Sequence, residues 1–555
     1  MDKEEFILYW TEKLKPWAEL QLKLSNISSI DEEMKKDISK IIPPIFYSTK
    51  KSLIILLQLT QGFLINEENN LDFYFSILEF LIPKIKEFLT SYEIFSIYHK
   101  TFNHILLWYY DHQLLDIETI IEVSKNDCDL FEYFIYDIKE HDEKIYEILN
   151  KRFDTQIHYH PLKNFKENRE ARINETPIAK AIRKDEIDEF QNIISLTNMN
   201  INSKIEFSLF ESCSAVNYSG SMPSLLEYAS FFGSIKIFKY LLLQNAEITS
   251  NIWEYAIHGN NYDIIHLIEG KHIPPHDCII NAIRYYRYDL FDYFIESQDI
   301  EITKNCINRA ILNFNLTVLI DERFLSILYD DPNFSQEIDI EWTPLICSAL
   351  KSYPIITEML LSIQNINPNI YYRFESSTPI IISARNYCFE NVKLLYEHPE
   401  TNVNTLIGTD IYFVSAQIGD TRIINYILSN NHNIHDNIQS FDNDFITKKY
   451  KELNFEVFFN CLVISIQNIH LNAFKLFYND PLFVQKENSF FYIIFMMAIQ
   501  NEFWDCVKFI IHSQPDETFD AFMEKIMNLI PEKSTDSVEI IKKIFDDEKM
   551  NRKKD

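Results

Sequence analysis

A helix–turn–helix unit of roughly thirty residues recurs along this chain, and it limits the possible folds more than any other feature. Its clearest copy is SLLEYASFFGSIKIFKYLLLQNAEI, which runs from Ser224 to Ile248. Apolar residues recur at helical spacing on both sides of Gly233, and glycine readily adopts the left-handed conformation that ends a helix. Two helices this short cannot bury their apolar faces alone. The unit therefore predicts neighbouring copies that pack against it.

Small residues mark the phase of these copies. In the first set the marker alanines are 27, 26 and 28 residues apart: Ala229, Ala256, Ala282 and Ala310. In a second set the marker alanines are 35 and 32 residues apart and keep more of one motif: Thr343, Pro344 and Leu345 with Ala349, Thr378 and Pro379 with Ala384, and Ala416 with Gly419. Self-similarity at such a period indicates a solenoid. We therefore predict an all-α protein, with an N-terminal helical bundle followed by a helix-turn-helix solenoid.

The pattern T-P-L, then a small residue, then a glycine and a leucine-rich second helix, resembles the ankyrin repeat. The resemblance covers Asn174 to Ile511. The first set, from Leu225 to Phe294, is similar to the divergent ankyrin-like domain of unknown function that precedes the regular repeats in large protist ankyrin families. Ile346 and Ile381 stand where the motif histidine is expected. That departure removes the usual polar network between adjacent repeats but not the stacking.

Five regions follow from this phase. We predict a helical domain over 1–152, a linker over 153–173, divergent ankyrin-like repeats over 174–329, ankyrin repeats over 330–512, and a C-terminal helical cap with a charged tail over 513–555. The stretch from Lys204 to Ser221 is irregular, and we interpret it as an insertion between repeats. The repeats of the first set are about six residues shorter than the full period. We infer that they lack the β-hairpin that projects between ankyrin repeats.

Composition excludes several classes of function. The chain has only 7 glycines, and no two lie closer than 11 residues, so a glycine-rich phosphate loop cannot form. None of the 8 cysteines has another within four residues, so the chain has no C-x-x-C zinc pair. His258, His266, His272 and His276 lie close in sequence, but Pro274 and Pro275 keep the last two from sharing a helix face. We predict no metal, no cofactor and no small-molecule ligand.

The net charge is −30, so the basic footprint of a nucleic-acid-binding protein is missing. The longest uninterrupted apolar run has 10 residues, which is too short to span a bilayer. The first residues do not resemble a signal peptide. These observations predict a cytoplasmic, soluble protein that binds neither nucleic acid nor a membrane. No catalytic motif occurs in the sequence, so we also predict that the protein is not an enzyme.

The resemblance implies a scaffold that binds a partner protein on its concave face and loops, since the side chains just after the motif alanines point to that face in the family. Carried onto this chain, the candidates are Phe231, Phe232, His258, Arg284, Tyr285, Lys351, Arg385 and Gln417. Packing against the preceding repeat is an equally open interpretation for Phe231 and Phe232. The alternative function is a substrate-recognition subunit of an enzyme complex, for example a ubiquitin ligase, with the N-terminal helices as its docking module. The sequence does not identify the partner.

Overall fold

The protein is all-α, as the repeat pattern predicts. The computed structural model describes residues 1–27, 30, 32–66, 70–98, 103–153, 162–217, 222–298, 301–334, 342–372, 377–402, 411–430, 457–480, 488–514, 516–529 and 535–552. Over these residues the backbone forms helices, and the only β pairing is two isolated bridges, Lys204 with Ser224 and Tyr372 with Ser377.

No helix in the described ranges combines the length and the apolar character needed to cross a membrane. The chain divides into two compact units: residues 1–120 with 129–401, and residues 121–128 with 402–555.

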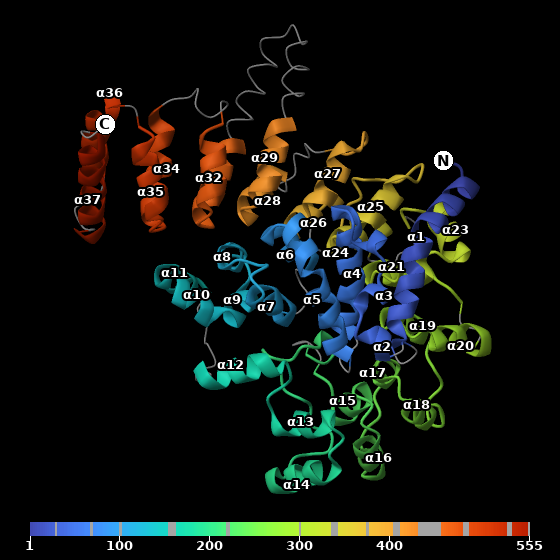
Figure 1. The fold of residues 1–555 in the computed structure, drawn as a ribbon. Helices are drawn as coiled ribbons and strands as arrows, with labels where there is room; N and C mark the ends of the chain where they lie inside the picture. The colour runs from blue at the N-terminus through green and yellow to red at the C-terminus, as the bar shows by residue number, and fades with distance from the viewer. Residues whose placement is uncertain are drawn as a thin grey trace. The chain divides into compact units, whose positions relative to one another are not determined.

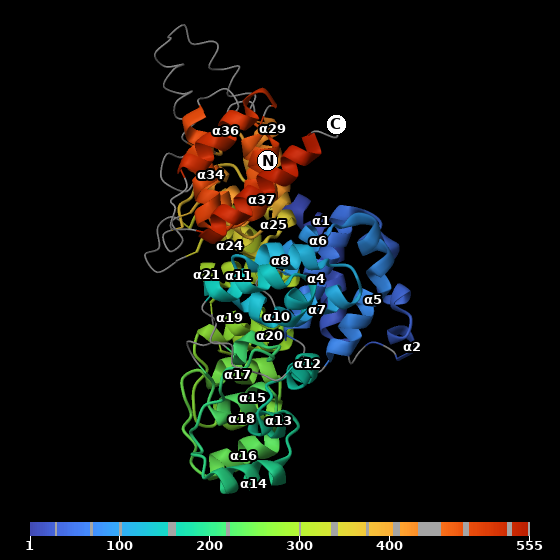
Figure 2. The same ribbon diagram turned by 90° about the vertical axis from the view of Figure 1, so that its left-hand side faces the viewer.

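Consecutive helix pairs form an ordered row in the first unit, and we call this row the helix-pair array. The pairs are α13 (Pro177–Arg183) with α14 (Ile187–Thr197), α15 (Leu225–Phe231) with α16 (Ile235–Leu243), α17 (Ile252–Gly259) with α18 (Tyr262–Glu269), α19 (Asp277–Arg284) with α20 (Tyr288–Gln298), α21 (Lys304–Leu312) with α22 (Leu316–Leu319) and α23 (Glu322–Asp330), α24 (Pro344–Lys351) with α25 (Pro354–Leu361), and α26 (Pro379–Arg385) with α27 (Phe389–Glu397). The first helices, α13, α15, α17, α19, α21, α24 and α26, contact one another in that order, and Figures 1 and 2 show the succession from green to yellow.

Local sequence explains where these helices begin and end. Ser224 caps α15 in a capping box, because its hydroxyl accepts from the N–H of Glu227 while the Glu227 carboxylate accepts from the N–H of Ser224. Thr343 caps α24 and Pro344 occupies its first turn, where the missing N–H of proline is harmless. Gly233 and Asn260 adopt positive φ in the turns after α15 and α17, which glycine and asparagine tolerate best.

The motif alanines lie where first helices meet. All of them are nearly inaccessible, with exposed fractions of 0–1%: Ala229, Ala256, Ala282, Ala310, Ala349, Ala384 and Ala416. A small side chain at these positions lets neighbouring helices approach closely, because interiors are packed without spare volume. Leu345 is also buried beside the Thr343–Pro344 cap.

A different set of polar side chains connects successive pairs in place of the missing motif histidines. In each case a side chain after one first helix donates to a carbonyl at the end of the preceding first helix. The bonds are Ser234 Oγ to Ile182 O (2.5 Å), Asn261 Nδ2 to Gly233 O (3.1 Å), Arg287 Nη2 to His258 O (2.6 Å), Asn315 Nδ2 to Ile283 O (2.8 Å), Tyr353 Oη to Leu312 O (3.4 Å) and Asn386 Nδ2 to Leu350 O (3.1 Å). They satisfy the carbonyls that every helix end leaves without an intrahelical partner.

The N-terminal region is also helical: α1 (Lys3–Ser25), α2 (Glu32–Lys35), α3 (Ile38–Ile41), α4 (Lys50–Asn66), α5 (Leu71–Phe88), α6 (Ser91–Tyr98), α7 (Asn103–Asp111), α8 (Ile117–Ser124), α9 (Cys128–Tyr133), α10 (Ile135–His141) and α11 (Glu143–Phe153). Helices α1, α4 and α6 contact the row, and the boundary expected at residue 152 does not separate two compact units. Helix α1 contacts α22 and α23, and Figure 1 shows it beside α23.

The physical reason for this docking lies in the turns within the helix pairs. Phe314 and Ser352 adopt positive φ there, and their carbonyls need donors. Gln21 Nε2 donates to Phe314 O at 2.8 Å, and Gln58 Nε2 donates to Ser352 O at 2.7 Å; both contacts are buried. Two N-terminal glutamines therefore pair with turn carbonyls of the array, which a search for apolar periodicity cannot detect.

The predicted linker over 153–173 is only partly irregular. Residues 154–161 lie outside the described part of the chain, but α12 (Leu162–Ala171) is a helix. Its Arg169 is buried, donates to Tyr133 O at 3.1 Å and pairs with Asp137 of α10 at 2.5 Å. This buried ion pair fixes α12 to the N-terminal helices, so the mixed charge that predicted a linker has a packing role instead.

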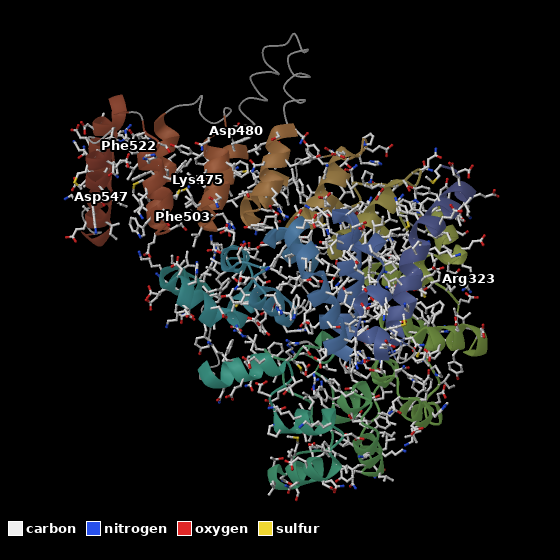
Figure 3. All side chains as sticks on the ribbon, viewed as in Figure 1. Arg323, Lys475, Asp480, Phe503, Phe522 and Asp547 are labelled. Carbon is white, nitrogen blue, oxygen red and sulfur yellow. The ribbon has the colours of Figure 1, made fainter. Side chains whose placement is uncertain are left out.

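The second unit consists of further helices and is described on its own. They are α28 (Ile411–Ile418), α29 (Thr421–Asn430), a helix over 457–467, α32 (Leu471–Tyr478), α34 (Asn488–Gln500), α35 (Trp504–His512), α36 (Asp516–Leu529) and α37 (Thr535–Arg552). Gly419 has positive φ after α28. Phe522, labelled in Figure 3, packs between Phe495 and Phe545 with ring centroids 5.7 and 6.3 Å away. Residues 553–555 of the predicted tail lie outside the described ranges.

A buried polar contact joins the two chain segments of this second unit. His470 is inaccessible, and its Nδ1 lies against the carboxylate of Glu122. Burial raises the pKa of Glu122, but the charges and hydrogen bonds of Lys125 and His470 outweigh burial and lower this pKa to about 2. Glu122 is therefore held as a carboxylate that fixes the segment 121–128 in this unit.

Candidate functional site

Three of the predicted contact residues are buried beneath the surface of the array. Phe231, His258 and Tyr285 are 1%, 6% and 0% exposed. Their rings form one column: Phe231 stacks on His258 with centroids 3.6 Å apart, and His258 meets Tyr285 edge-on at 4.7 Å. The prediction that these three side chains offer an accessible surface is therefore wrong. Each is at or just past the end of its first helix, where it packs on a neighbouring pair instead of facing outward.

Four other candidates have separate surroundings. Phe232 is partly exposed, and the guanidinium of Arg183 lies over its ring, 4.1 Å from the centroid. Lys351 is exposed at the end of α24, whereas Arg385 donates to Ser377 Oγ at 2.7 Å. Gln417 is exposed and belongs to the second unit, where its carbonyl lies 2.8 Å from His470 Nε2. Phe232 also adjoins the buried column, because its ring centroid lies 5.0 Å from that of Phe231.

The remaining candidate, Arg284, lines a hollow of about 420 Å³ on the surface made by the first helices. We call this hollow the polar hollow. The surface around it, formed by α17, α19, α21 and Trp342, we call the first-helix face. The polar side chains that line the hollow are Glu254, Asp277, Asn281, Arg284, Asn305, Asn308, Arg309 and Trp342. Ile280 and Leu312 contribute its apolar part.

Glu254 is fixed at one side of the hollow by two partners. Arg284 Nη1 donates to its Oε1 at 2.6 Å, and the hydroxyl of buried Tyr285 donates to the same oxygen at 3.1 Å. Burial raises the pKa of that tyrosine, and the nearby charge of Arg284 acts in the opposite direction. The buried ring column therefore has a role at this site, because it holds the Glu254–Arg284 pair in place from below.

Arg309, on the next first helix, lies close enough to interact electrostatically with this pair. Burial lowers its pKa, the positive charge of Arg284 lowers it further, and Glu254 acts in the opposite direction. Its side chain forms no hydrogen bond or ion pair with any residue in the described ranges. Asp277 is the second carboxylate that lines the hollow. Burial is the main reason why the pKa values of the Cys278 and Cys306 thiols are raised, and the negative charge of Asp277 raises them further.

Two further polar atoms of the hollow are buried and make no hydrogen bond within the described structure: Asn308 Oδ1 and Trp342 Nε1. Asn308 is only 5% exposed. Its Nδ2 donates to Trp342 O at 2.6 Å, and because a carbonyl can only accept, this bond fixes which end of the amide is the oxygen. One acceptor and one donor of the hollow therefore have no hydrogen-bond partner among the described residues.

Sequence reasoning found Arg284 but missed the other polar residues of the hollow. A usable signal was present, since Asp277, Asn281 and Arg284 are spaced by four and three residues and so share one face of α19. Asn305, Arg309 and Leu312 repeat that spacing on α21. The accessible stripe therefore begins before the motif alanine of each first helix, whereas the resemblance directed attention to the residues after it.

Glu254 and Arg284 bind each other in the hollow, and Asp277 is a second carboxylate of its lining. Glu254 is held by Arg284 and Tyr285, and the thiols of Cys278 and Cys306 are buried with raised pKa values. In the described ranges, no group of three His, Cys, Asp or Glu side chains is placed to hold a metal ion. The hollow can form hydrogen bonds through its asparagine amides and the indole of Trp342, and it can form ion pairs through its guanidinium groups.

One family model matches part of this region. A domain of unknown function (DUF3447) matches residues 244–321, which contain α17 to α21 and every residue of the polar hollow except Trp342. The match covers less than half of the chain. The chain has no match among curated proteins.

Proposed function

We propose that this chain is a non-catalytic interaction module, an ankyrin-type solenoid that binds another protein on its first-helix face. The observation that carries the proposal is the polar hollow, because it spans successive first helices and contains polar groups that have no partner within the described part of the chain. A rigid row of paired helices holds such groups in fixed positions, which reduces the conformational entropy lost on binding. The resemblance of the second set of repeats to ankyrin repeats supports the same function.

We further propose that the protein acts inside the cell. Most of its cysteines are buried as free thiols within helices, which agrees with a reducing compartment. The strongly acidic composition favours solubility and weakens attraction to nucleic acid.

Obstructing the hollow should abolish partner binding without unfolding the array. Asn281 and Asn305 line it and make no side-chain hydrogen bond within the described structure, so changing both to arginine fills the hollow with long cationic side chains. We expect capture of specific partners to fall by about tenfold or more, as when a central contact is lost. The measurement is affinity capture with the full chain, followed by quantitative identification of the bound proteins.

The matched control places the same two charges elsewhere. Gln191 and Asn192 are exposed on the second helix α14, so arginine at both positions should leave capture and the melting temperature unchanged within error. Equal capture by the wild type and the Asn281 and Asn305 double variant would refute binding on this face. Loss of capture in both double variants would point to a general charge effect instead.

A further inference from the structure

We propose that the polar hollow binds the side-chain carboxylate of an aspartate or glutamate in an extended segment of the partner, with Arg309 as its main cationic contact. This proposal rests on the proposed function and adds the chemistry of the ligand. It concerns the hollow alone and does not depend on the rest of the binding surface.

The first argument is charge balance. Glu254 is already bonded to Arg284 at 2.6 Å, and Asp277, the other carboxylate of the hollow, forms no ion pair with Arg309 within the described structure. Two guanidinium groups that repel each other in a half-buried site are unfavourable unless a further anion is present. A single carboxylate supplies one negative charge and accepts two parallel N–H bonds from an arginine. A phosphorylated side chain carries nearly two negative charges, about twice the charge of the Arg309 guanidinium, and it would lie in a hollow that Glu254 and Asp277 already line.

The second argument is the pair of buried polar atoms without partners. Native proteins leave few buried polar groups unsatisfied. Several buried polar atoms in the described ranges lack a hydrogen bond, and these two line the same hollow, where one bound molecule can complete both sets of hydrogen bonds. Trp342 Nε1 is a donor and requires an acceptor, which a carboxylate oxygen provides. Asn308 Oδ1 is an acceptor and requires a donor, which the backbone N–H of the same acidic residue provides. One amino-acid residue within a peptide carries both groups, whereas a free inorganic anion carries only the acceptors.

The hollow also has room for more than the carboxylate. Its volume of about 420 Å³ and its apolar lining by Ile280 and Leu312 leave space for the methylene groups and backbone of the bound residue. Binding by extended peptides commonly combines such apolar pockets with a few polar anchors. An acidic residue flanked by ordinary peptide backbone therefore matches the hollow in charge, polarity and size.

The test uses Trp342 itself as the reporter. The chain has 6 tryptophans, so full-length protein labelled with 5-fluorotryptophan should give six fluorine resonances, and Trp342→Phe identifies the one from the hollow. The probes are N-acetyl-glutamate methylamide, which carries a side-chain carboxylate, N-acetyl-glutamine methylamide, which has the same shape without the charge, and N-acetyl-glutamine, whose only carboxylate is at the C-terminus. We expect the Trp342 resonance to shift with the first probe, saturating at millimolar concentrations, and at least tenfold more weakly with the others.

Variants assign the effect to Arg309. Arg309→Gln should abolish the shift, and Arg309→Lys, which keeps the charge but loses the planar fork, should retain part of it. The matched control is Arg323→Gln, because Arg323 is 54% exposed and pairs only locally with Asp321 at 2.6 Å; it is labelled in Figure 3. In Arg323→Gln the Trp342 resonance should shift with N-acetyl-glutamate methylamide as it does in the wild type.

Several outcomes would overturn the inference. An equal shift with the glutamine and glutamate methylamides would show that charge is irrelevant, and no shift with any probe would show that the hollow does not bind peptide groups of this kind. A shift only with N-acetyl-glutamine would assign the site to a C-terminal carboxylate instead. In each of these cases the capture experiment on Asn281 and Asn305 still decides whether the first-helix face binds a protein, so the two proposals fail independently.

Discussion

Replacing Glu211 with alanine should destabilise the start of the helix-pair array by about 3–5 kcal/mol, the cost of breaking a buried ion pair from one side. Glu211 is 6% exposed, and its carboxylate accepts from the Arg183 guanidinium, from the hydroxyl of Tyr228 at 3.0 Å and from the N–H of Cys213 at 3.1 Å. The variant leaves Arg183, whose side chain is only 10% exposed, without its counter-charge. Native-state hydrogen exchange in α13 and α15 measures the loss, because unfolding of a helix row is local.

Two controls separate the ion pair from general damage to this stretch. Glu206→Ala removes an exposed carboxylate from the same irregular stretch and should change the opening free energy by less than about 0.5 kcal/mol. Combining Glu211→Leu with Arg183→Met removes both charges and should restore most of the stability, since apolar replacement of a buried pair is often neutral. Unchanged exchange protection in α13 and α15 of Glu211→Ala would contradict the prediction.

Glu211 also illustrates what the sequence could not predict. It belongs to the stretch from Lys204 to Ser221, which has no periodicity, and an isolated glutamate there is most simply interpreted as solvated. Its burial depends on Arg183 and Tyr228, which are 28 and 17 residues away. Pairings over such distances are set by the packed fold, and no local pattern encodes them.

The parts that could be predicted are those governed by local physics. The phase of the alanines indicated where first helices meet, and the burial of Ala256 and Ala310 agrees with that placement. The positive φ of Gly233 follows from its position after a short helix, and the Thr343–Pro344 cap follows from the chemistry of helix starts. Each of these requires only a residue and its near neighbours in sequence.

The site was predicted less well because side-chain direction changes at the end of a helix. Arg284 and Tyr285 are adjacent, yet Arg284 lines the polar hollow and Tyr285 lies buried beneath it. Tyr285 is the first residue after α19, where the chain leaves the helix and the side chain turns toward the neighbouring pair. The spacing within the helix, through Asp277 and Asn281, would have indicated the accessible face better than the residues that follow it.

Replacing Gly259 with alanine should destabilise the contact between α15 and α17 by about 2–3 kcal/mol, at the upper end of the usual cost of overpacking. A β-carbon at Gly259 would lie 2.2 Å from the carbonyl oxygen of Ser230 and 3.0 Å from that of Phe231. Both are backbone atoms at the end of α15 that cannot rotate away, so the two first helices must separate. The intrinsic preference of alanine for helices, about 1 kcal/mol over glycine, offsets only part of this cost.

Gly270→Ala is the matched control for this prediction, because it is also a glycine at a helix end but its surroundings are open. Gly270 has φ −60°, and an added β-carbon there would come no closer than 3.6 Å to His266 O, which is ordinary contact. Alanine should therefore be neutral or stabilise the protein by about 0.4–1 kcal/mol, through a less flexible unfolded chain. Hydrogen exchange should show faster opening of α15 and α17 in Gly259→Ala alone. Equal protection in the two variants would mean that the first helices do not approach as closely as the structure has them, and that the alanine phase does not mark their contact.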